Sequence, residues 1–177
     1  MMRRATIVGT GLYAPEKVVS NEYFNELYGE DVDSFLRENR NIKERRYAAE
    51  DQATSDLAAE AARDAMDDAG IEPADVDLLL VSTDTPDQIS PSTAAVVQDK
   101  LDARNAATFD INTACAGFVT ALDTGRKFLE ADDQYDNVLV LGAYLMSRFI
   151  DYDQKNIASL FADGAGAAVL APTTGDD

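Results

Sequence analysis

The sequence contains no histidine and no tryptophan, and Cys115 is its only cysteine. Without histidine, the chain lacks the imidazole that many zinc sites and most general acid–base mechanisms use. A single thiol excludes an internal disulfide, and no spacing of Asp, Asn, Gly and Glu matches a calcium-binding loop. The sequence therefore predicts that this chain holds no metal.

Basic residues are also scarce, since 15 Lys and Arg stand against 33 Asp and Glu, a formal net charge of −18. Such a surface repels nucleic-acid phosphates and anionic lipid, so we expect neither a nucleic-acid partner nor a membrane partner. Repulsion among the carboxylates is largely screened at about 1 M salt, where the Debye length is ~3 Å. We therefore predict a halophilic protein; an ordinary acidic cytosolic protein is the alternative.

Long hydrophobic runs are missing as well. The longest, from Val138 to Met146, has less than half of the roughly 20 residues that a membrane-spanning helix needs. The first residues reach Gly9 before an apolar segment of the kind found in export signals can form. These absences predict a cytoplasmic protein.

What the chain does contain is an alternation of strand-like and helix-like segments. Continuous apolar runs of strand length occur at residues 5–8, 76–82, 108–111, 138–143 and 165–170. Helical patterns occupy residues 21–27, 33–39, 55–69, 93–101 and 115–130. Runs without polar alternation are typical of strands covered on both faces, so the sequence predicts an α/β layered fold with a mixed, mostly parallel sheet.

Two of the predicted helices differ in kind. Helix 55–69 has small apolar residues on one face and acidic residues, Asp64 among them, facing water on the other. The first three turns of helix 115–130 are apolar almost all round, which predicts a central helix buried between layers. We expect one domain over residues 1–172, with residues 173–177 as a tail or a cut end.

Two glycine clusters invite comparison with nucleotide-binding loops. Residues 9–14 fit a loose G-x-G-x-x-A pattern, but Pro15 follows at once and keeps the segment from opening a helix. Residues 161–168 lack the Lys-Ser/Thr ending of a phosphate loop. We therefore expect a strand-to-loop turn at the first cluster, a tight turn before the last strand at the second, and no resident cofactor.

Cys115 is the candidate nucleophile. A lone intracellular cysteine is most often an inert apolar residue, but this one stands where a predicted strand passes into a predicted helix. Unpaired N–H groups and the helix dipole favour a thiolate in the first helical turn. The small neighbours Ala114, Ala116 and Gly117 leave room for a substrate carbonyl, so the sequence predicts nucleophilic catalysis by Cys115.

Four segments of the chain carry a resemblance to a known family. They are I-V-G-T-G-L-Y-A-P at residues 7–15, S-P-S-T-A-A-V-V-Q-D-K-L at 90–101, D-I-N-T-A-C-A-G-F-V-T-A-L at 110–122 and L-F-A-D-G-A-G-A-A-V-L at 160–170. In this order they resemble the 3-oxoacyl-acyl-carrier-protein synthase III family of condensing enzymes. The resemblance implies a thiolase-like fold, of which this chain is the N-terminal half of an αβαβα duplication.

The resemblance also implies a decarboxylative Claisen condensation of an acyl-coenzyme A with a malonyl thioester. Cys115 would accept the acyl group, and its own backbone N–H would form part of the oxyanion hole. The family places the histidine and the asparagine for decarboxylation in the second half of the fold, which this sequence does not include. The isolated chain is therefore expected to be inactive in condensation, and coenzyme A enters as a substrate.

Matched positions imply further substrate-binding residues. Relatives hold the coenzyme A adenine between a tryptophan and an arginine, and Phe35 and Lys155 stand at these positions; a lysine offers no planar guanidinium face. Ser90 takes the place of an aromatic residue that enters the partner subunit's acyl pocket, which implies room for a larger or branched acyl group. Met146 and Phe161 are the other matched pocket positions.

Partners follow from the same resemblance: a homodimer or a complementary C-terminal half chain, and an acyl carrier protein if a basic patch forms on this acidic chain. The candidate patch consists of Arg37, Arg40, Lys43, Arg45 and Arg46. Two alternatives stay open. One is a non-catalytic thiolase-like binding or structural subunit; the other is thiolase or hydroxymethylglutaryl-coenzyme A synthase chemistry.

Overall fold

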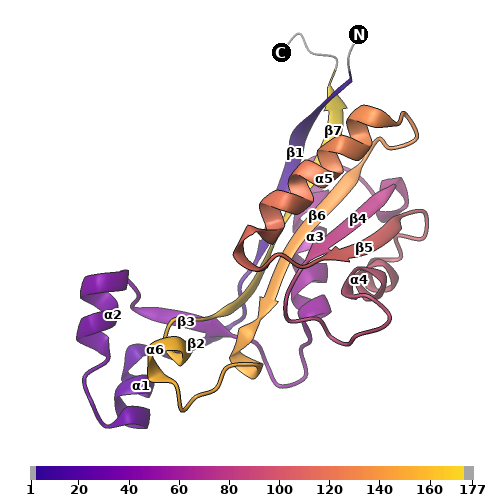
Figure 1. Ribbon diagram of the computed structural model, residues 1–177. Coiled ribbons are helices and arrows are strands. Elements are labelled where there is room, and N and C mark those ends of the chain that lie inside the picture. Colours follow the sequence, from indigo (N-terminus) through magenta and orange to yellow (C-terminus); the bar gives the residue numbers. More distant parts are fainter. Residues whose placement is uncertain (1–2, 174–177) are drawn as a thin grey trace.

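The computed structural model describes residues 3–173, which form a five-stranded sheet with helices on both faces and a smaller lobe at one end (Figure 1). In chain order the elements are β1 (Arg4–Tyr13), β2 (Lys17–Ser20), α1 (Asn21–Tyr28), α2 (Asp33–Arg40), β3 (Glu44–Tyr47), α3 (Thr54–Ala69), β4 (Leu78–Ser82), α4 (Thr93–Leu101), β5 (Ala107–Ile111), α5 (Gly117–Ala131), β6 (Val138–Leu145), α6 (Lys155–Ala158) and β7 (Asp163–Thr173). The predicted α/β layering is confirmed.

The main sheet is mixed, in the strand order β1-β7-β6-β4-β5. Strand β4 pairs in parallel with β5 and β6, whereas β7 runs antiparallel to both β6 and β1. All strands but β7 therefore point the same way, as a mostly parallel sheet requires. The carboxyl ends of β4, β5 and β6 meet at one end of the sheet, which is where ligand sites form in α/β folds.

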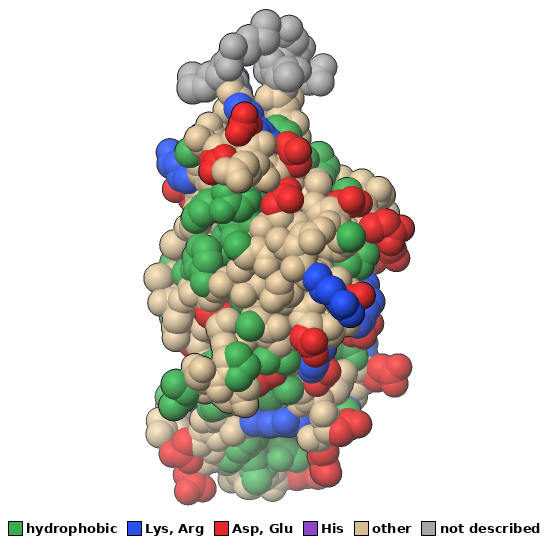
Figure 2. Space-filling view, turned by 90° about the vertical axis from the view of Figure 1, so that its right-hand side faces the viewer, with side chains coloured by type: hydrophobic (Ala, Val, Ile, Leu, Met, Phe, Trp, Pro, Cys, Tyr) green, Lys and Arg blue, Asp and Glu red, His purple; other side chains and the backbone are tan. Residues whose placement is uncertain are grey.

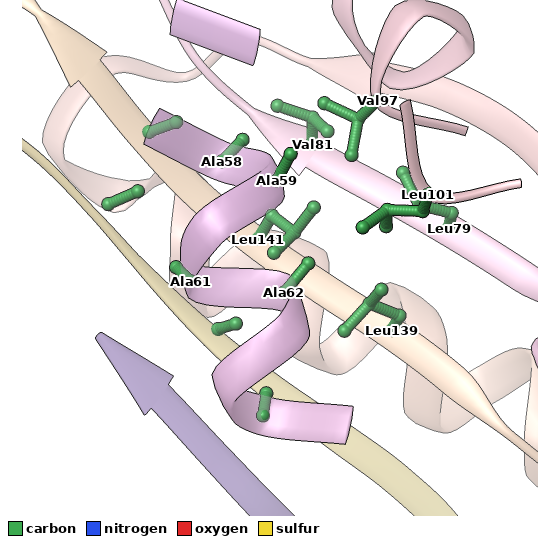
Figure 3. Packing of buried hydrophobic residues seen from close by; sticks show 14 of the residues in the cluster. Ala58, Ala59, Ala61, Ala62, Leu79, Val81, Val97, Leu101, Leu139 and Leu141 are labelled. Carbon is green, nitrogen blue, oxygen red and sulfur yellow. The ribbon is translucent and has the colours of Figure 1, made fainter. Parts of the chain in front are cut away.

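Helix α3 covers one face of the sheet with a surface of alanines (Figure 3). Ala58, Ala61 and Ala62 are fully buried, in one core with Leu139 and Leu141 of β6. Small side chains let the helix lie close to the strands, since protein interiors leave little free volume. The amphipathic helix predicted over residues 55–69 is confirmed.

Gly9 and Gly11 lie inside β1, so the predicted strand-to-loop turn is wrong. A Cβ atom on Gly11 would lie 2.1 Å from the Ala61 carbonyl oxygen, and one on Gly9 would lie 2.5 Å from that of Ala65. These glycines allow the strand to pass against the backbone of α3. The second glycine cluster also lies largely inside a strand, β7, and the tight turn predicted there is wrong.

Two carboxylates of α3 bind the outer edge of β1. Asp68 accepts a hydrogen bond from the Thr10 backbone N–H (2.8 Å), and Asp64 accepts one from that of Leu12 (2.9 Å). Asp64 is exposed, as predicted, but its carboxylate also binds the edge strand, which the sequence did not reveal. A free strand edge can add another chain, and two N–H groups of this edge are occupied.

Helix α5 lies on the opposite face of the sheet (Figure 1). Its buried residues, Gly117, Ala121, Gly125 and Leu129, form the side that faces the strands. Val119, on the other side, is 68% exposed. The prediction that this helix is buried between two layers is therefore wrong for residues 3–173, where the sheet covers one side of it and the other side is exposed.

The smaller lobe consists of β2, β3, α1, α2 and α6 around a core that includes Phe24, Leu36 and Tyr47. The sequence pattern did not reveal its two strands, because charged residues interrupt them and β3 reads E-R-R-Y. Asp163, at the start of β7, joins the lobe to the sheet. Its buried carboxylate accepts hydrogen bonds from Ala48 N (2.8 Å), Ser147 N (2.9 Å) and Ser147 Oγ (2.6 Å), which compensate its desolvation.

The basic patch predicted between Arg37 and Arg46 does not form as one exposed surface. Arg45 is buried, and burial lowers the pKa of its guanidinium. Arg37 pairs with Asp33 on its own helix (2.7 Å), and Arg46 donates a hydrogen bond to the Glu16 carbonyl (3.2 Å). Docking of an acidic partner depends on uncompensated positive charge; Arg40 and Lys43 are exposed and form none of the ion pairs found within residues 3–173, so some positive charge remains there.

Carboxylates are spread widely over the surface, as the face in Figure 2 shows. Ion pairs within residues 3–173, such as Arg104 with Asp102 (2.5 Å) and Arg63 with Glu60 (2.6 Å), join partly or largely exposed side chains. Exposed pairs contribute roughly 0–1 kcal/mol each. Pairing therefore leaves most of the acidic excess unneutralised.

Strand β7 ends at Thr173, so the predicted tail begins inside a strand, and its other residues, 174–177, lie outside the described part of the chain. Over residues 3–173, no helix combines the length and the apolar character needed to cross a membrane. The same residues bring together no group of three or more acidic, cysteine or histidine side chains that could hold a metal ion.

We predict that Gly11→Ala destabilises the chain by about 1–3 kcal/mol, since the added methyl group collides with helix backbone that cannot move aside. Denaturant unfolding measures the loss. Gly166→Ala is the matched control, because its Cβ would meet nothing closer than 3.9 Å. Equal stability of the two variants would contradict the close approach of α3 to β1.

Candidate functional site

A cavity of about 260 Å³ lies at the carboxyl ends of β4, β5 and β6. Its lining residues are Ser82, Thr83, Asp84, Ala114, Cys115, Phe118, Gly142, Ala143, Tyr144 and Phe161. Most of the wall is apolar, and Cys115 carries the one thiol of the sequence. The fold thus brings a nucleophile to the wall of a largely apolar cavity.

Cys115 lies in a 3-10 turn, Ala114–Ala116, between β5 and α5. Helix α5 begins at Gly117, directly after this turn, so Cys115 stands in the first turn of the helical segment, as predicted, although that turn is a 3-10 turn. The cysteine is exposed. Ala114 just before it has φ of 48°, a left-handed conformation that is uncommon outside glycine and that concentrates at functional sites.

Gly117 allows α5 to begin directly against the end of β4. A Cβ atom on Gly117 would lie 1.9 Å from Ser82 Oγ and 3.2 Å from Ser82 Cβ, so a larger residue would require the Ser82 hydroxyl to rotate away and would still crowd the end of the strand. Since Cys115 is two residues earlier, this contact also fixes the distance of the thiol-bearing turn from the sheet.

Buried hydroxyl groups hold the loop after β4 in place. The Thr85 hydroxyl accepts a hydrogen bond from Leu145 N of β6 (2.9 Å), and Thr54 Oγ1 of α3 donates one to the Thr85 carbonyl (2.5 Å). Thr83 Oγ1 accepts one from Thr85 N (3.0 Å). Buried polar groups paired in this way rigidify the backbone, here at one wall of the cavity.

Asp110 anchors the strand that leads to Cys115. Its carboxylate accepts hydrogen bonds from Thr93 N (2.8 Å) and Ala94 N (2.7 Å) at the start of α4. A negative charge is favourable at a helix N-terminus. The contact therefore ties β5 to α4, and each carboxylate oxygen of Asp110 accepts a hydrogen bond from that helix.

Tyr144 and Phe161 form another wall of the cavity, with ring centres 6.1 Å apart. Burial raises the pKa of the Tyr144 phenol, and the nearby Asp84 and Cys115 raise it further. The phenol therefore stays protonated at neutral pH and can donate a hydrogen bond within the cavity that contains the thiol.

The residues predicted from the sequence fall into different places. Phe161 lines the cavity with Cys115, whereas Met146 lies just beyond β6 and is not among the lining residues. Ser90 is exposed in the loop before α4 and does not line it either. Phe35 and Lys155 share a second cavity, of about 220 Å³, in the smaller lobe.

Sequence reasoning missed Tyr144 and Asp84. Neither belongs to a motif, and Tyr144 reads as one more apolar residue of a strand. The signal that could have found them is position: both follow the buried segments of parallel strands, β6 and β4, at the ends that converge on Cys115.

Comparison with known proteins gives a consistent match. Residues 109–177 match the family model for 3-oxoacyl-[acyl-carrier-protein (ACP)] synthase III. Beta-ketoacyl-[acyl-carrier-protein] synthase III of Clostridium perfringens is 45% identical over 175 residues, which are 99% of this chain and 53% of that protein. The one from Staphylococcus haemolyticus is 47% identical over 164 residues, 93% of this chain and 52% of its own length.

Solved structures agree. 3-Oxoacyl-[acyl-carrier-protein] synthase III from Aquifex aeolicus superimposes with a TM-score of 0.91 and 36% identity, covering 96% of this chain and 54% of its own. The priming beta-ketosynthase of the R1128 polyketide pathway gives 0.92 and 33%, with 97% and 51% covered. The chain thus spans about half the length of these relatives, and its fold is thiolase-like.

We predict that Cys115 reacts with iodoacetamide in the folded chain, because its side chain is exposed at the cavity wall. Intact mass spectrometry should show one adduct per chain at a rate within about tenfold of the unfolded chain, since access and thiolate fraction set the rate. Cys115→Ser is the control and should stay unmodified. A thiol that reacts only after denaturation would exclude an accessible nucleophile.

Proposed function

Because this chain belongs to the 3-oxoacyl-[acyl-carrier-protein] synthase III family and spans about half the length of its relatives, we propose that it supplies the acyl-accepting cysteine of a condensing enzyme. The observation that carries the proposal is the exposed thiol of Cys115 on a cavity formed by the carboxyl ends of three parallel strands. The reaction is a decarboxylative Claisen condensation.

In the first step, the Cys115 thiolate attacks the carbonyl carbon of an acyl thioester, such as an acyl-coenzyme A. The negative charge that develops on the carbonyl oxygen is stabilised by backbone N–H groups, that of Cys115 among them. The carbon–sulfur bond to the donor then breaks, and the donor leaves as a thiolate. The acyl group remains on Cys115 as a new thioester.

The second step requires groups that this chain does not contain. Loss of carbon dioxide from a malonyl thioester leaves a carbanion equivalent, which attacks the acyl-cysteine carbonyl and releases the Cys115 thiolate. A histidine and an asparagine of the second half of the fold would stabilise this step, and the present sequence has no histidine. We therefore propose acylation, without condensation, for the isolated chain.

The cavity walls support an acyl group as the ligand. Phe118 and Phe161 offer apolar contact, and Tyr144 offers one hydrogen-bond donor. We keep Ser90 and Met146 as proposed acyl-pocket residues of the assembled enzyme, since this chain alone does not bring them to the cavity. Phe35 and Lys155, in the smaller lobe, are the proposed contacts for the nucleotide end of coenzyme A.

A partner that covers α5 completes the proposal. The outer side of this helix, with Val119, is exposed, and Leu12 of β1 is 72% exposed. Apolar faces of this kind mark interaction surfaces. We propose a complementary half chain as the occupant of this face, and a homodimer of the completed enzyme. We propose that an acyl carrier protein docks through the exposed Arg40 and Lys43, together with positive charge from the rest of the assembly.

We predict that incubation with an acyl-coenzyme A adds one acyl group to Cys115. Intact mass spectrometry should show the mass increase, and hydroxylamine, which cleaves thioesters, should remove it. Cys115→Ser should show neither change. Absence of an adduct in strong salt, with the chain demonstrably folded, would favour the alternative of a non-catalytic thiolase-like subunit.

We also propose a halophilic, cytoplasmic origin, supported by the net charge of −18 and by the largely exposed ion pairs. Screening of carboxylate repulsion should then raise the melting temperature by about 5 °C or more between 0.1 M and 2 M KCl. Thermal melts followed by circular dichroism test this. A melting temperature that does not change, or that falls, would contradict the proposal.

A further inference from the structure

The cavity of the smaller lobe is lined by unusually many acidic groups for a site that would take an anionic nucleotide. Its lining residues are Glu30, Asp31, Val32, Phe35, Lys155, Asn156 and Ser159. They come from the segment that follows α1, from α2, and from α6 and the residue after it. Two carboxylates and a single ammonium group therefore surround a volume of about 220 Å³.

The ammonium group of this cavity is already paired. Lys155 Nζ lies 2.5 Å from Glu30 Oε1, and the two side chains are about half exposed, at 48% and 46%. The segments that carry them are fixed nearby, because the Tyr28 hydroxyl donates to the Tyr152 carbonyl (2.8 Å). Glu30 thus competes with any incoming anion for the charge of Lys155.

The second carboxylate also stays charged. Asp31 accepts hydrogen bonds from Ser34 Oγ (2.6 Å) and Ser34 N (3.0 Å), and these lower the pKa of its carboxyl group. At neutral pH the lining of the cavity therefore carries one negative charge more than it carries positive charge.

Phe35 nevertheless offers a place for a planar ring. Its side chain is 48% exposed and lines the cavity, and the Arg40 guanidinium stands 5.3 Å from its ring centre. Arg40 is not among the residues that line the cavity, whereas Phe35 is, so the ring is accessible from the cavity. The site therefore combines a stacking surface with an unfavourable charge.

We propose that Glu30 is a specificity-determining residue, which holds Lys155 in an ion pair and thereby weakens the binding of thioester donors that carry a phosphorylated nucleotide relative to donors that carry none. The inference rests on the proposed function, in which Phe35 and Lys155 contact the nucleotide end of coenzyme A. The diphosphate and the ribose phosphate of coenzyme A must meet Glu30 and Asp31, whereas a short pantetheine-like thioester reaches Cys115 without entering this cavity.

Binding of adenosine 3′,5′-bisphosphate, the nucleotide end of coenzyme A, tests the proposal without involving Cys115. Titration calorimetry at 0.1 M KCl should show about two- to fivefold tighter binding to Glu30→Gln than to the unchanged chain, the range typical of one partly exposed charge. At 2 M KCl the difference should shrink, because the Debye length falls below ~3 Å.

A double-mutant cycle separates the ion pair from general charge effects. Lys155→Met should weaken binding more in the Glu30→Gln background than in the unchanged chain, because only there is the ammonium group free. Glu60→Gln is the matched control: Glu60 pairs with Arg63 at similar exposure on α3, and its loss should leave probe affinity unchanged. Additive effects, no tightening in Glu30→Gln, or no binding of the probe to any variant would overturn the proposal.

The rate of Cys115 acylation by two donors distinguishes failure of the Glu30 proposal from failure of the proposed function. The rate ratio for acyl-coenzyme A against acyl-N-acetylcysteamine, a donor without nucleotide, should rise about two- to fivefold in Glu30→Gln. If neither donor acylates Cys115 while the probe still binds more tightly to Glu30→Gln, the proposed catalysis fails and the role of Glu30 stands. If both donors react and the rate ratio is unchanged in Glu30→Gln, the proposed acylation stands and the proposed role of Glu30 fails.

Discussion

The contact between Gly117 and Ser82 determines where the thiol stands. The start of the helix lies there directly against the Ser82 side chain, since a methyl group on Gly117 would overlap Ser82 Oγ and lie 3.2 Å from Ser82 Cβ. The turn that precedes the helix is therefore held at the end of the sheet, with Ala114 in a left-handed conformation and Cys115 exposed. Asp110 and the hydroxyl network of Thr83 and Thr85 hold the adjoining backbone. The position of the thiol thus depends on contacts between side chains and the backbone around it.

Much of this fold could be predicted from local pattern. The strands β4 and β6 appear as continuous apolar runs because both of their faces are covered, and α3 appears as a stripe of alanines. The small neighbours of Cys115 predicted an accessible thiol, and the cysteine is exposed at a cavity wall. The same logic fails where a different force decides: β3, with its sequence E-R-R-Y, is held by pairing with β2 and by the buried guanidinium of Arg45, and no hydrophobic pattern announces it.

Two other differences between the predicted and the observed structure have physical causes that cannot be recognised in a single sequence. Glycine is unfavourable in a strand, yet Gly9 and Gly11 belong to β1 because the helix above leaves no room for a Cβ atom. The apolar circumference of α5 predicts burial all round, whereas the described chain covers one side. A hydrophobic pattern shows which residues favour burial, but it does not show which element covers them. Tyr144 and Asp84 escaped prediction because only topology places them beside Cys115.

The hydrogen bonds from the β1 amides to Asp64 and Asp68 affect self-association of the protein at high salt concentration. Long-range repulsion between highly charged molecules normally keeps them apart, but concentrated electrolyte removes it beyond a few ångströms. Sheet-to-sheet addition must then be resisted at contact distance. A carboxylate that accepts a hydrogen bond from an edge N–H group resists such addition. An incoming β-strand would have to break that hydrogen bond and leave the carboxylate charge without its donor. Asp64 and Asp68 therefore still block pairing at this edge of the sheet when salt has screened their long-range repulsion.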